Sequence, residues 1–344
     1  MSKLYDIVVV GGGPAGLYVA SLLEDAFDVI VLERHERIGH KACSGLISKN
    51  LDRFVKPDDA VEHEVTGATV HGPGGATASL KKSGGVYVID RKAFDRMLAE
   101  RLSCPLTTGT TVSSITQMKD GVSLETAAGA VRAAVILGCD GVSSIVGRHM
   151  GQRPAEVLTG LKSVVDERDA GDTVDVFFDK AAAKDGFLWR IPRGSRVEYG
   201  AMGTGLDFAA LEKFFRPAER GEREAALIPI GPCKTFAERM LLLGDAAGHT
   251  KPWSGGGVIF SLTAAHAAAS AIERCFAAED FSAVALSGYE AAWKETIGKE
   301  IEMGLLGRAM LKDMGNRDMD SLVAKLAGAT LSHVDMDFPF FSLG

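Results

Sequence analysis

The sequence predicts an α/β fold, in which a Rossmann-like dinucleotide-binding domain carries an inserted antiparallel β-sheet domain and a short C-terminal helical region. Three observations support this prediction. A strand, a glycine turn, a helix and a second strand occupy residues 5–33, a second glycine-containing turn follows a buried strand near residue 244, and strand patterns fill the middle of the chain. A chain of 344 residues is long enough to bury the cores of both domains.

The first glycine turn has the spacing of a dinucleotide site. The apolar run Val8–Val10 leads into Gly11, Gly13 and Gly16, which satisfy G-x-G-x-x-G. Such glycines permit a tight turn, close approach of a pyrophosphate and close helix–strand packing, and the helix N-terminus attracts phosphate. A second strand over residues 28–32 ends at Glu33, where a carboxylate can accept ribose hydroxyls. The residues expected to bind the dinucleotide here are Gly11, Gly13, Pro14, Ala15, Gly16, Glu33 and Arg34.

Composition narrows the class of protein. The net charge of −7 gives no reason to expect a nucleic-acid partner. The five cysteines are widely spaced and form no C-x-x-C pair, which argues against a disulfide framework or a metal site and suits a reducing cytosol. A strand begins almost at the first residue, so we expect no signal peptide, and no apolar run is long enough to cross a bilayer. We therefore expect a cytoplasmic protein.

Strand and helix patterns then divide the chain. Strands are expected at 67–72, 84–90, 110–117, 120–126, 130–138, 174–178, 186–191, 196–201 and 239–244, and helices at 91–102, 255–276 and within 288–326. The charged stretch 212–224 indicates a solvated helix and loop. We assign residues 1–66, 91–156 and 236–287 to the dinucleotide-binding domain, 67–90 and 157–235 to the β-sheet domain, and 288–344 to the helical region.

A second G-x-G-x-x-G is absent from the sequence, so one site must hold the resident cofactor.

The segment 244–257 is the second cofactor signal. Asp245 follows a strand, where a carboxylate can bind a ribitol hydroxyl. Gly255, Gly256 and Gly257 open a helix and can present N–H groups to an anion such as the N1–C2=O2 region of a flavin, unless they are only a helix cap. We expect His249, in the same segment, to be a local hydrogen-bond partner. Asp140 follows another strand, and the simplest expectation is that it caps the helix containing Arg148.

The order of these motifs, G-G-G-P-A-G, D-G-x-x-S and G-D-A-A-G, resembles the flavoproteins of the para-hydroxybenzoate hydroxylase fold. Three segments resemble geranylgeranyl reductases in particular over about residues 3–300. Lys41–Gly45 corresponds to their cysteine–glycine loop, Phe187–Pro192 to Y-x-W-x-F-P with Phe for Tyr and Ile for Phe, and Lys251–Gly257 to P-x-x-G-G-G. That family usually has a longer C-terminal helical portion.

The resemblance implies FAD as cofactor and reduction of isoprenoid double bonds by hydride transfer. It also implies a prenyl-lipid substrate, NAD(P)H or a ferredoxin-like protein as electron donor, and peripheral contact with a membrane. It places Cys43 and Ser44 at the flavin, Arg91 at the ribitol–phosphate portion and Val112 at adenine. The remaining implied residues are Asp245, Gly256, Gly257 and Val258 at ribitol and flavin, Cys43 as catalytic group, and Phe187, Trp189 and Trp253 at the substrate.

Simpler interpretations remain open at this point. A lone cysteine is most often a small buried hydrophobe, and Trp189 can be core rather than the wall of an apolar tunnel. An FAD-dependent aromatic hydroxylase or other monooxygenase would share every nucleotide motif. A flavin- or lipid-binding protein without turnover is a third possibility.

Overall fold

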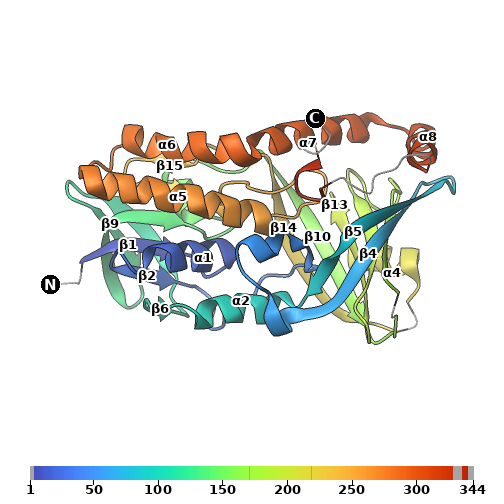
Figure 1. Cartoon of the computed structure of the whole chain (residues 1–344), viewed down its shortest axis with the longest axis horizontal. Helices are drawn as coiled ribbons and strands as arrows, with labels where there is room; N and C mark the ends of the chain where they lie inside the picture. The colour runs from blue at the N-terminus through green and yellow to red at the C-terminus, as the bar shows by residue number, and fades with distance from the viewer. Residues whose placement is uncertain (1–3, 170, 218, 328–334, 340–344) are drawn as a thin grey trace. The chain divides into compact units, whose positions relative to one another are not determined.

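The computed structural model describes residues 4–169, 171–217, 219–327 and 335–339, which form two compact units (Figure 1). Unit 1 comprises residues 1–41, 92–157 and 229–301, and unit 2 comprises 42–91, 158–228 and 302–344. The three-part division expected from the sequence follows the strand and helix patterns, and it stays a prediction.

Unit 1 is built on a sheet with a parallel centre. Its strand order is β15-β16-β9-β1-β2-β6, and β8 and β7 continue from β9 as an antiparallel meander. The bounds are β1 Leu4–Val10, β2 Val29–Leu32, β6 Leu106–Thr107, β7 Val112–Gln117, β8 Val122–Thr126, β9 Gly129–Gly138, β15 Phe236–Ala237 and β16 Met240–Leu242. Val9 of β1 pairs with Val31 of β2 and Leu137 of β9, all of them buried. Continuous apolar strands of this kind suit a parallel sheet covered on both faces.

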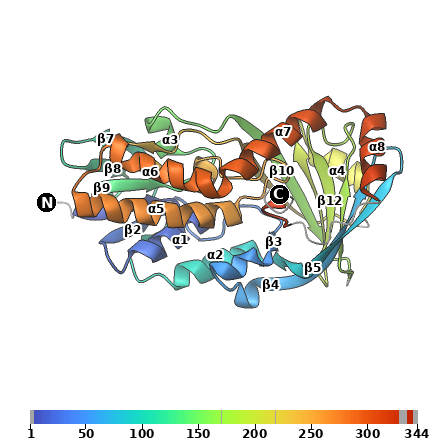
Figure 2. The same ribbon diagram turned by 45° about the horizontal axis from the view of Figure 1, so that its top comes forward.

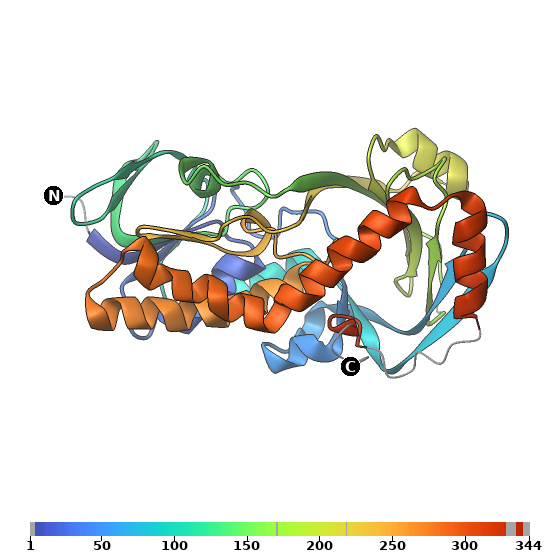
Figure 3. The same cartoon turned by 90° about the horizontal axis from the view of Figure 1, so that it is seen from above.

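The helices of unit 1 cover this sheet. They are α1 Pro14–Leu23, α2 Arg91–Glu100, α3 Ile145–His149, α5 Val258–Ala278, α6 Ala283–Trp293 and the π-helical turn η4 Lys294–Gly298, with the 3₁₀ turn η3 Gly244–Ala246. Helix α5 packs along α1 and α6 (Figure 3), and Tyr18 Oη lies 2.9 Å from Nε2 of His266. The predicted β-α-β unit and long helix are confirmed. Helix α5 begins three residues later than expected, because Gly255 is left-handed (φ +72°).

Unit 2 is built on a second, mostly antiparallel sheet. Its order is β14-β10-β13-β12-β11-β4-β5-β3, in which β4 and β11 run parallel. The bounds are β3 Leu46–Ser48, β4 Val61–His71, β5 Thr77–Ile89, β10 Glu156–Val165, β11 Thr173–Phe177, β12 Phe187–Pro192, β13 Val197–Gly203 and β14 Glu222–Ile230. The helical elements are η1 Lys49–Arg53, η2 Asp58–Ala60, α4 Phe208–Phe215, α7 Lys299–Asp313 and α8 Asn316–Leu326. Figure 2 shows α8 beside the β4–β5 hairpin.

One stretch of unit 2 corrects the sequence interpretation. Residues 212–224 were expected to be a solvated helix and loop; the end of α4 and the described residues that follow it agree with this, but β14 begins at Glu222. The charged side chains Glu222, Arg223 and Glu224 stand at the start of this edge strand. Charged residues are common on edge strands because they discourage pairing with another chain. The charges at residues 222–224 therefore belong to an edge strand of the sheet, while the residues before them agree with the expected helix and loop.

The core of unit 2 reaches the C-terminal segment. Val65, Val88, Val174 and Ile191 are buried in one cluster, against which Trp189 and Met336 pack. Ser48 Oγ and Asn50 Nδ2 donate hydrogen bonds to the buried carboxylate of Asp337, and Asn50 also bonds Asp335. Residues 335–337 are thus attached to the sheet. Within the described residues no helix is both long and apolar enough to cross a membrane.

Candidate functional site

The first glycine turn has the geometry that a pyrophosphate site needs. Gly11 is left-handed (φ +108°), and a Cβ at Gly16 would clash with the carbonyl oxygen of Gly11. A Cβ at Gly13 would meet no described atom within 4 Å, so the turn opens to free space at this residue. The first amides of α1, at Ala15 and Gly16, have no earlier carbonyl of the helix to bond. The turn therefore combines close backbone packing with N–H groups available to an anion.

Glu33 lies against this turn at the end of β2. Its side chain is nearly buried, and its Oε2 accepts the Gly12 N–H at 2.7 Å. Its Oε1 accepts the backbone N–H of His35 at 2.8 Å. The Thr110 N–H donates to the Glu33 carbonyl oxygen, which brings the chain before Val112 to the same place. Arg34 is exposed, and the side chain of Val112 is buried in the core.

The second glycine turn adjoins the first. A Cβ at Gly244 would lie 3.0 Å from Ala15 Cβ and 3.2 Å from Ser261 Oγ. The Asp245 carboxylate stands before the α5 N-terminus, because its Oδ1 would be 3.3 Å from a Cβ at Gly257. The structure therefore brings α1, Asp245 and the start of α5 together in unit 1, as a single dinucleotide site requires.

Two lysines near α5 were not singled out from the sequence. The exposed Lys41 forms an ion pair with Asp245. The buried Lys251 has its Cε 3.0 Å from the position of a Cβ at Gly256, which is exposed. Lys251 comes directly before the P-x-x-G-G-G motif of residues 252–257, and this position was the available sequence signal. Trp253 and Val258 are both half-buried in this segment.

His249 differs from the expectation. Its ring lies 4.7 Å from the Trp293 ring and 6.5 Å from the Tyr289 ring, centroid to centroid. Neither ring nitrogen has a hydrogen-bond partner in the described part of the chain. The local bond is made by the backbone instead, from the His249 N–H to the Gly244 carbonyl at 3.0 Å. Burial lowers the pKa of this histidine to about 3, so the ring is neutral at physiological pH.

Asp140 caps a helix, as the simpler interpretation expected. Its Oδ2 accepts the Ile145 N–H at 2.6 Å at the start of α3, where Ser144 is the N-cap residue. Its Oδ1 is buried and meets no hydrogen-bond partner among the described residues. Burial raises the pKa of Asp140. The Asp140 Cα also packs against Gly11, so this aspartate supports the first glycine turn.

Comparisons with known proteins cover almost the whole chain. A family model of the NAD(P)-binding Rossmann-like domain matches residues 9–80. An uncharacterized protein of Methanocaldococcus jannaschii is 30% identical, covering 97% of this chain and 92% of that protein. The digeranylgeranylglycerophospholipid reductase of Methanothrix thermoacetophila is 28% identical, covering 96% of this chain and 93% of that protein. The crystal structure of a geranylgeranyl bacteriochlorophyll reductase-like protein from Thermoplasma acidophilum has a TM-score of 0.90 at 20% identity, covering 100% and 96% of the two chains.

The chain belongs to the geranylgeranyl reductase family. The family's flavoprotein fold is the one predicted from the order of the three glycine motifs.

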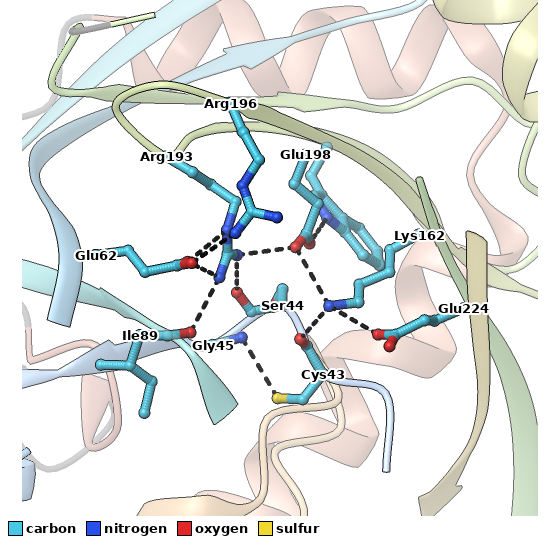
Figure 4. Close-up of polar contacts among 11 residues, drawn as sticks. Cys43, Ser44, Gly45, Glu62, Ile89, Lys162, Arg193, Arg196, Glu198 and Glu224 are labelled. Atoms are coloured by element: carbon cyan, nitrogen blue, oxygen red, sulfur yellow. Dashed lines mark hydrogen bonds and ion pairs between the residues drawn. The ribbon is translucent and has the colours of Figure 1, made fainter. Parts of the chain in front are cut away.

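The cysteine loop of this geranylgeranyl reductase family member lies in unit 2 (Figure 4). Cys43 is half-buried, and the Gly45 N–H lies 3.4 Å from its Sγ. Lys162 Nζ donates to the Cys43 carbonyl at 2.9 Å, and Arg193 Nη1 donates to the Ser44 carbonyl at 2.7 Å. Gly45 is left-handed (φ +70°), and a Cβ there would clash with the Ile89 carbonyl. The loop is therefore held by side chains and by tight packing.

The tryptophan strand lies in the same unit. Trp189 is half-buried, its Nε1 donates to Glu198 Oε1 at 2.9 Å, and its ring centroid lies 5.7 Å from that of Phe187. Trp189 and Ile191, two residues apart on β12, pack in one cluster, as residues on the same face of a strand do. Arg91, which opens α2, is buried. The sequence interpretation missed Lys162, Arg193 and Glu198, although a glutamate inside an apolar strand was a visible signal.

Proposed function

We propose that this protein is an FAD-dependent oxidoreductase that reduces carbon–carbon double bonds of a geranylgeranyl-type prenyl lipid. The observation that carries the proposal is the meeting of two glycine turns in unit 1, where Gly244 packs against Ala15 and Asp245 stands before α5. The open space at Gly13 and the acid at Glu33 fit the diphosphate and ribose of FAD. The printed names of relatives support the prenyl-lipid class.

Each cofactor residue has a proposed task. The first amides of α1, at Ala15 and Gly16, bind the pyrophosphate, and Glu33 accepts ribose hydroxyls beside Arg34, with Val112 at adenine. Arg91 and Asp245 bind the ribitol–phosphate portion. Gly256, Gly257 and Val258 at the start of α5 stabilise negative charge on the bound cofactor, helped by the nearby ammonium of Lys251.

Bound FAD in its reduced form supplies a hydride. The hydride joins one alkene carbon and a proton joins the other, so the π bond is lost and two C–H bonds form. We assign Cys43 to the reacting atoms, with its thiol or a water as the proton donor. An unactivated alkene accepts hydride poorly, so the chain must hold the bond in place and exclude water. The aromatic side chains of Phe187, Trp189 and Trp253 are proposed to contact the apolar substrate.

The reductant and the lipid surface belong to the same proposal. We propose NAD(P)H or a ferredoxin-like protein as the electron donor. Met303, Leu306 and Met310 project exposed apolar surface from α7 at spacings of three and four residues, which place them on one side of the helix. This stripe supports peripheral contact with a membrane, and flotation with phospholipid vesicles tests it.

The decisive experiment is anaerobic turnover. The purified protein should be yellow, hold FAD without a covalent bond, and, once reduced by dithionite, convert a digeranylgeranyl glycerophospholipid to species heavier by one dihydrogen per bond in mass spectrometry. Glu33→Ala should weaken FAD binding by about 1–3 kcal/mol, because Gly12 and the ribose lose their acceptor.

Three results would contradict this function. A colourless protein that binds NAD would contradict the assignment of FAD as the cofactor. Oxygen-dependent NAD(P)H oxidation that requires an aromatic substrate would indicate a hydroxylase. An isoprenoid held tightly without any change in mass would indicate a binding protein.

A further inference from the structure

The loop of Cys43 and Ser44 is held by two cations that reach it from distant strands of unit 2. Lys162 belongs to β10 and bonds the Cys43 carbonyl, whereas Arg193 follows β12 and bonds the Ser44 carbonyl. The two pairs are separated by 119 and 149 residues in the sequence. The carbonyl direction fixes the adjoining peptide planes, so these contacts restrict where the thiol of Cys43 can lie.

Arg193 uses its whole guanidinium group for this purpose. Nε and Nη2 bond Glu62, Nη2 also bonds the Ile89 carbonyl at 3.0 Å, and Nη1 bonds Ser44 and Glu198. A guanidinium has five N–H donors in a rigid plane, so every donor has an acceptor here. Lysine could not reproduce this arrangement, because its ammonium has three donors and no planar fork.

Glu198 connects the two cations with the tryptophan. This carboxylate is completely buried, accepts Trp189 Nε1 at 2.9 Å and Arg193 Nη1 at 2.9 Å, and lies 3.9 Å from Lys162 Nζ. Lys162 is also paired with Glu224 at 3.0 Å. Figure 4 shows Lys162, Arg193 and Glu198 around the Cys43 loop.

Burying the charges of Arg193 and Glu198 costs free energy, so the network must provide a benefit other than stability. An apolar replacement of a whole buried ion pair is often as stable as the pair, so such groups contribute little net stability. Their benefit is then geometric, because a fully bonded charge network allows few other arrangements.

We propose that Lys162, Arg193 and Glu198 are positioning residues that join the Cys43 loop and the indole of Trp189 in one rigid frame. As a statement about the reaction, this inference rests on the proposed function, which assigns Cys43 to the reacting atoms and Trp189 to the substrate. A shift of the indole is thereby transmitted to the cysteine loop.

Two variants of the FAD-bound protein test the frame. Lys162→Met removes the contact with the Cys43 carbonyl, and Trp189→Phe keeps every charge but removes the hydrogen bond to Glu198. The first readout is the rate at which N-ethylmaleimide alkylates Cys43, followed by peptide mass spectrometry. We expect a several-fold change in both variants, recovery toward the native rate in Lys162→Arg, and no change in Lys56→Met, whose ion pair with Asp52 is on the surface.

Turnover is the second readout. Lys162→Met should lower kcat by roughly tenfold to a hundredfold with little change in KM, as expected when a reacting group is displaced. Trp189→Phe should change both constants. If the wild type does not reduce the lipid, the proposed function fails, while the alkylation rates still judge the frame.

Native alkylation rates in folded Lys162→Met and Trp189→Phe would overturn the inference. If Lys162→Met does not fold, Trp189→Phe decides alone, because a rate equal to that of the wild type would show that the indole and the loop are not joined.

Discussion

The buried ring of His249 is uncharged at physiological pH. Its ring is buried against Trp293 and Tyr289, and burial lowers its pKa from 6.5 to about 3. A proton therefore binds the unfolded chain more readily than the folded one. The stability linked to this residue is complete above about pH 6.5 and is lost progressively as the pH falls toward about 3.

We expect the urea midpoint of the FAD-bound protein to fall between pH 7.5 and pH 5.5, and to fall less in His249→Met, which has no titrating ring. Burial raises the pKa values of Asp140 and Glu198, so these two carboxyl groups act in the opposite direction and favour the folded state as the pH falls. Equal pH dependence of the two proteins would show that His249 is not the group responsible.

Residues that follow strands could be predicted, whereas residues that act across the fold could not. Glu33 directly follows β2, and Asp245 lies in the turn η3 three residues after the end of β16, so their spacing from the glycines indicates their position. Lys162 and Arg193 reach the Cys43 loop over more than a hundred residues, and no local pattern encodes that contact. The ring of His249 was wrongly expected to bond locally, because the sequence does not show which neighbours will be aromatic.

At the scale of elements, the turn between β1 and α1 determines how closely the helix packs against the strand. A Cβ at Gly16 would clash with the Gly11 carbonyl, but a Cβ at Gly13 meets open space in the described structure. Gly16→Ala should therefore lower the free energy of unfolding by about 1–3 kcal/mol, the usual cost of overpacking, even without FAD.

Gly13→Ala is the matched control. It should leave the FAD-free protein as stable as the wild type in urea and weaken only FAD binding, because its methyl group would occupy the open space in front of the turn. A stable Gly16→Ala protein would mean that the helix can move away from the strand at little cost.

The presence of strands and helices was easier to predict than the residues at which they begin and end. The apolar runs of β1, β2 and β9 are continuous and buried, so they gave clear signals. Strand β14 was missed because an edge strand tolerates charge that resembles a solvated loop. The start of α5 was misplaced because three glycines in a row do not show which one ends the turn.

At the scale of the whole molecule, unit 2 gains a contact from the far end of the chain. Asp337 is fully buried and accepts hydrogen bonds from Ser48 and Asn50, and Met336 packs on the sheet. Asp337→Ala would leave the buried Ser48 hydroxyl without its acceptor and remove one of the acceptors of Asn50. We expect a loss of about 1–3 kcal/mol in the free energy of unfolding.

Urea unfolding measures this loss, with Asp313→Ala on the exposed side of α7 as the control. An Asp337→Ala protein as stable as the control would show that residues 335–337 contribute little to holding unit 2 together.

The predicted order of motifs identified the fold and family of the whole molecule, because glycine turns and acids are local signals repeated along the chain. The attachment of residues 335–337 to Ser48 and Asn50 joins positions up to 289 residues apart. The sequence showed only an aromatic tail over residues 338–341, of which 340 and 341 lie outside the described residues.

The pairing of Trp189 with Gly200 across β12 and β13 has a consequence for redesigning the substrate contact that we propose for Trp189. A Cβ at Gly200 would clash with the indole, so the large residue needs the smallest one opposite it. Replacing Trp189 alone with a smaller residue opens a hole, and enlarging Gly200 alone displaces the indole. Changing both residues together can instead preserve their total side-chain volume, which would move the proposed apolar contact from one strand to the other while keeping the packing of the sheet.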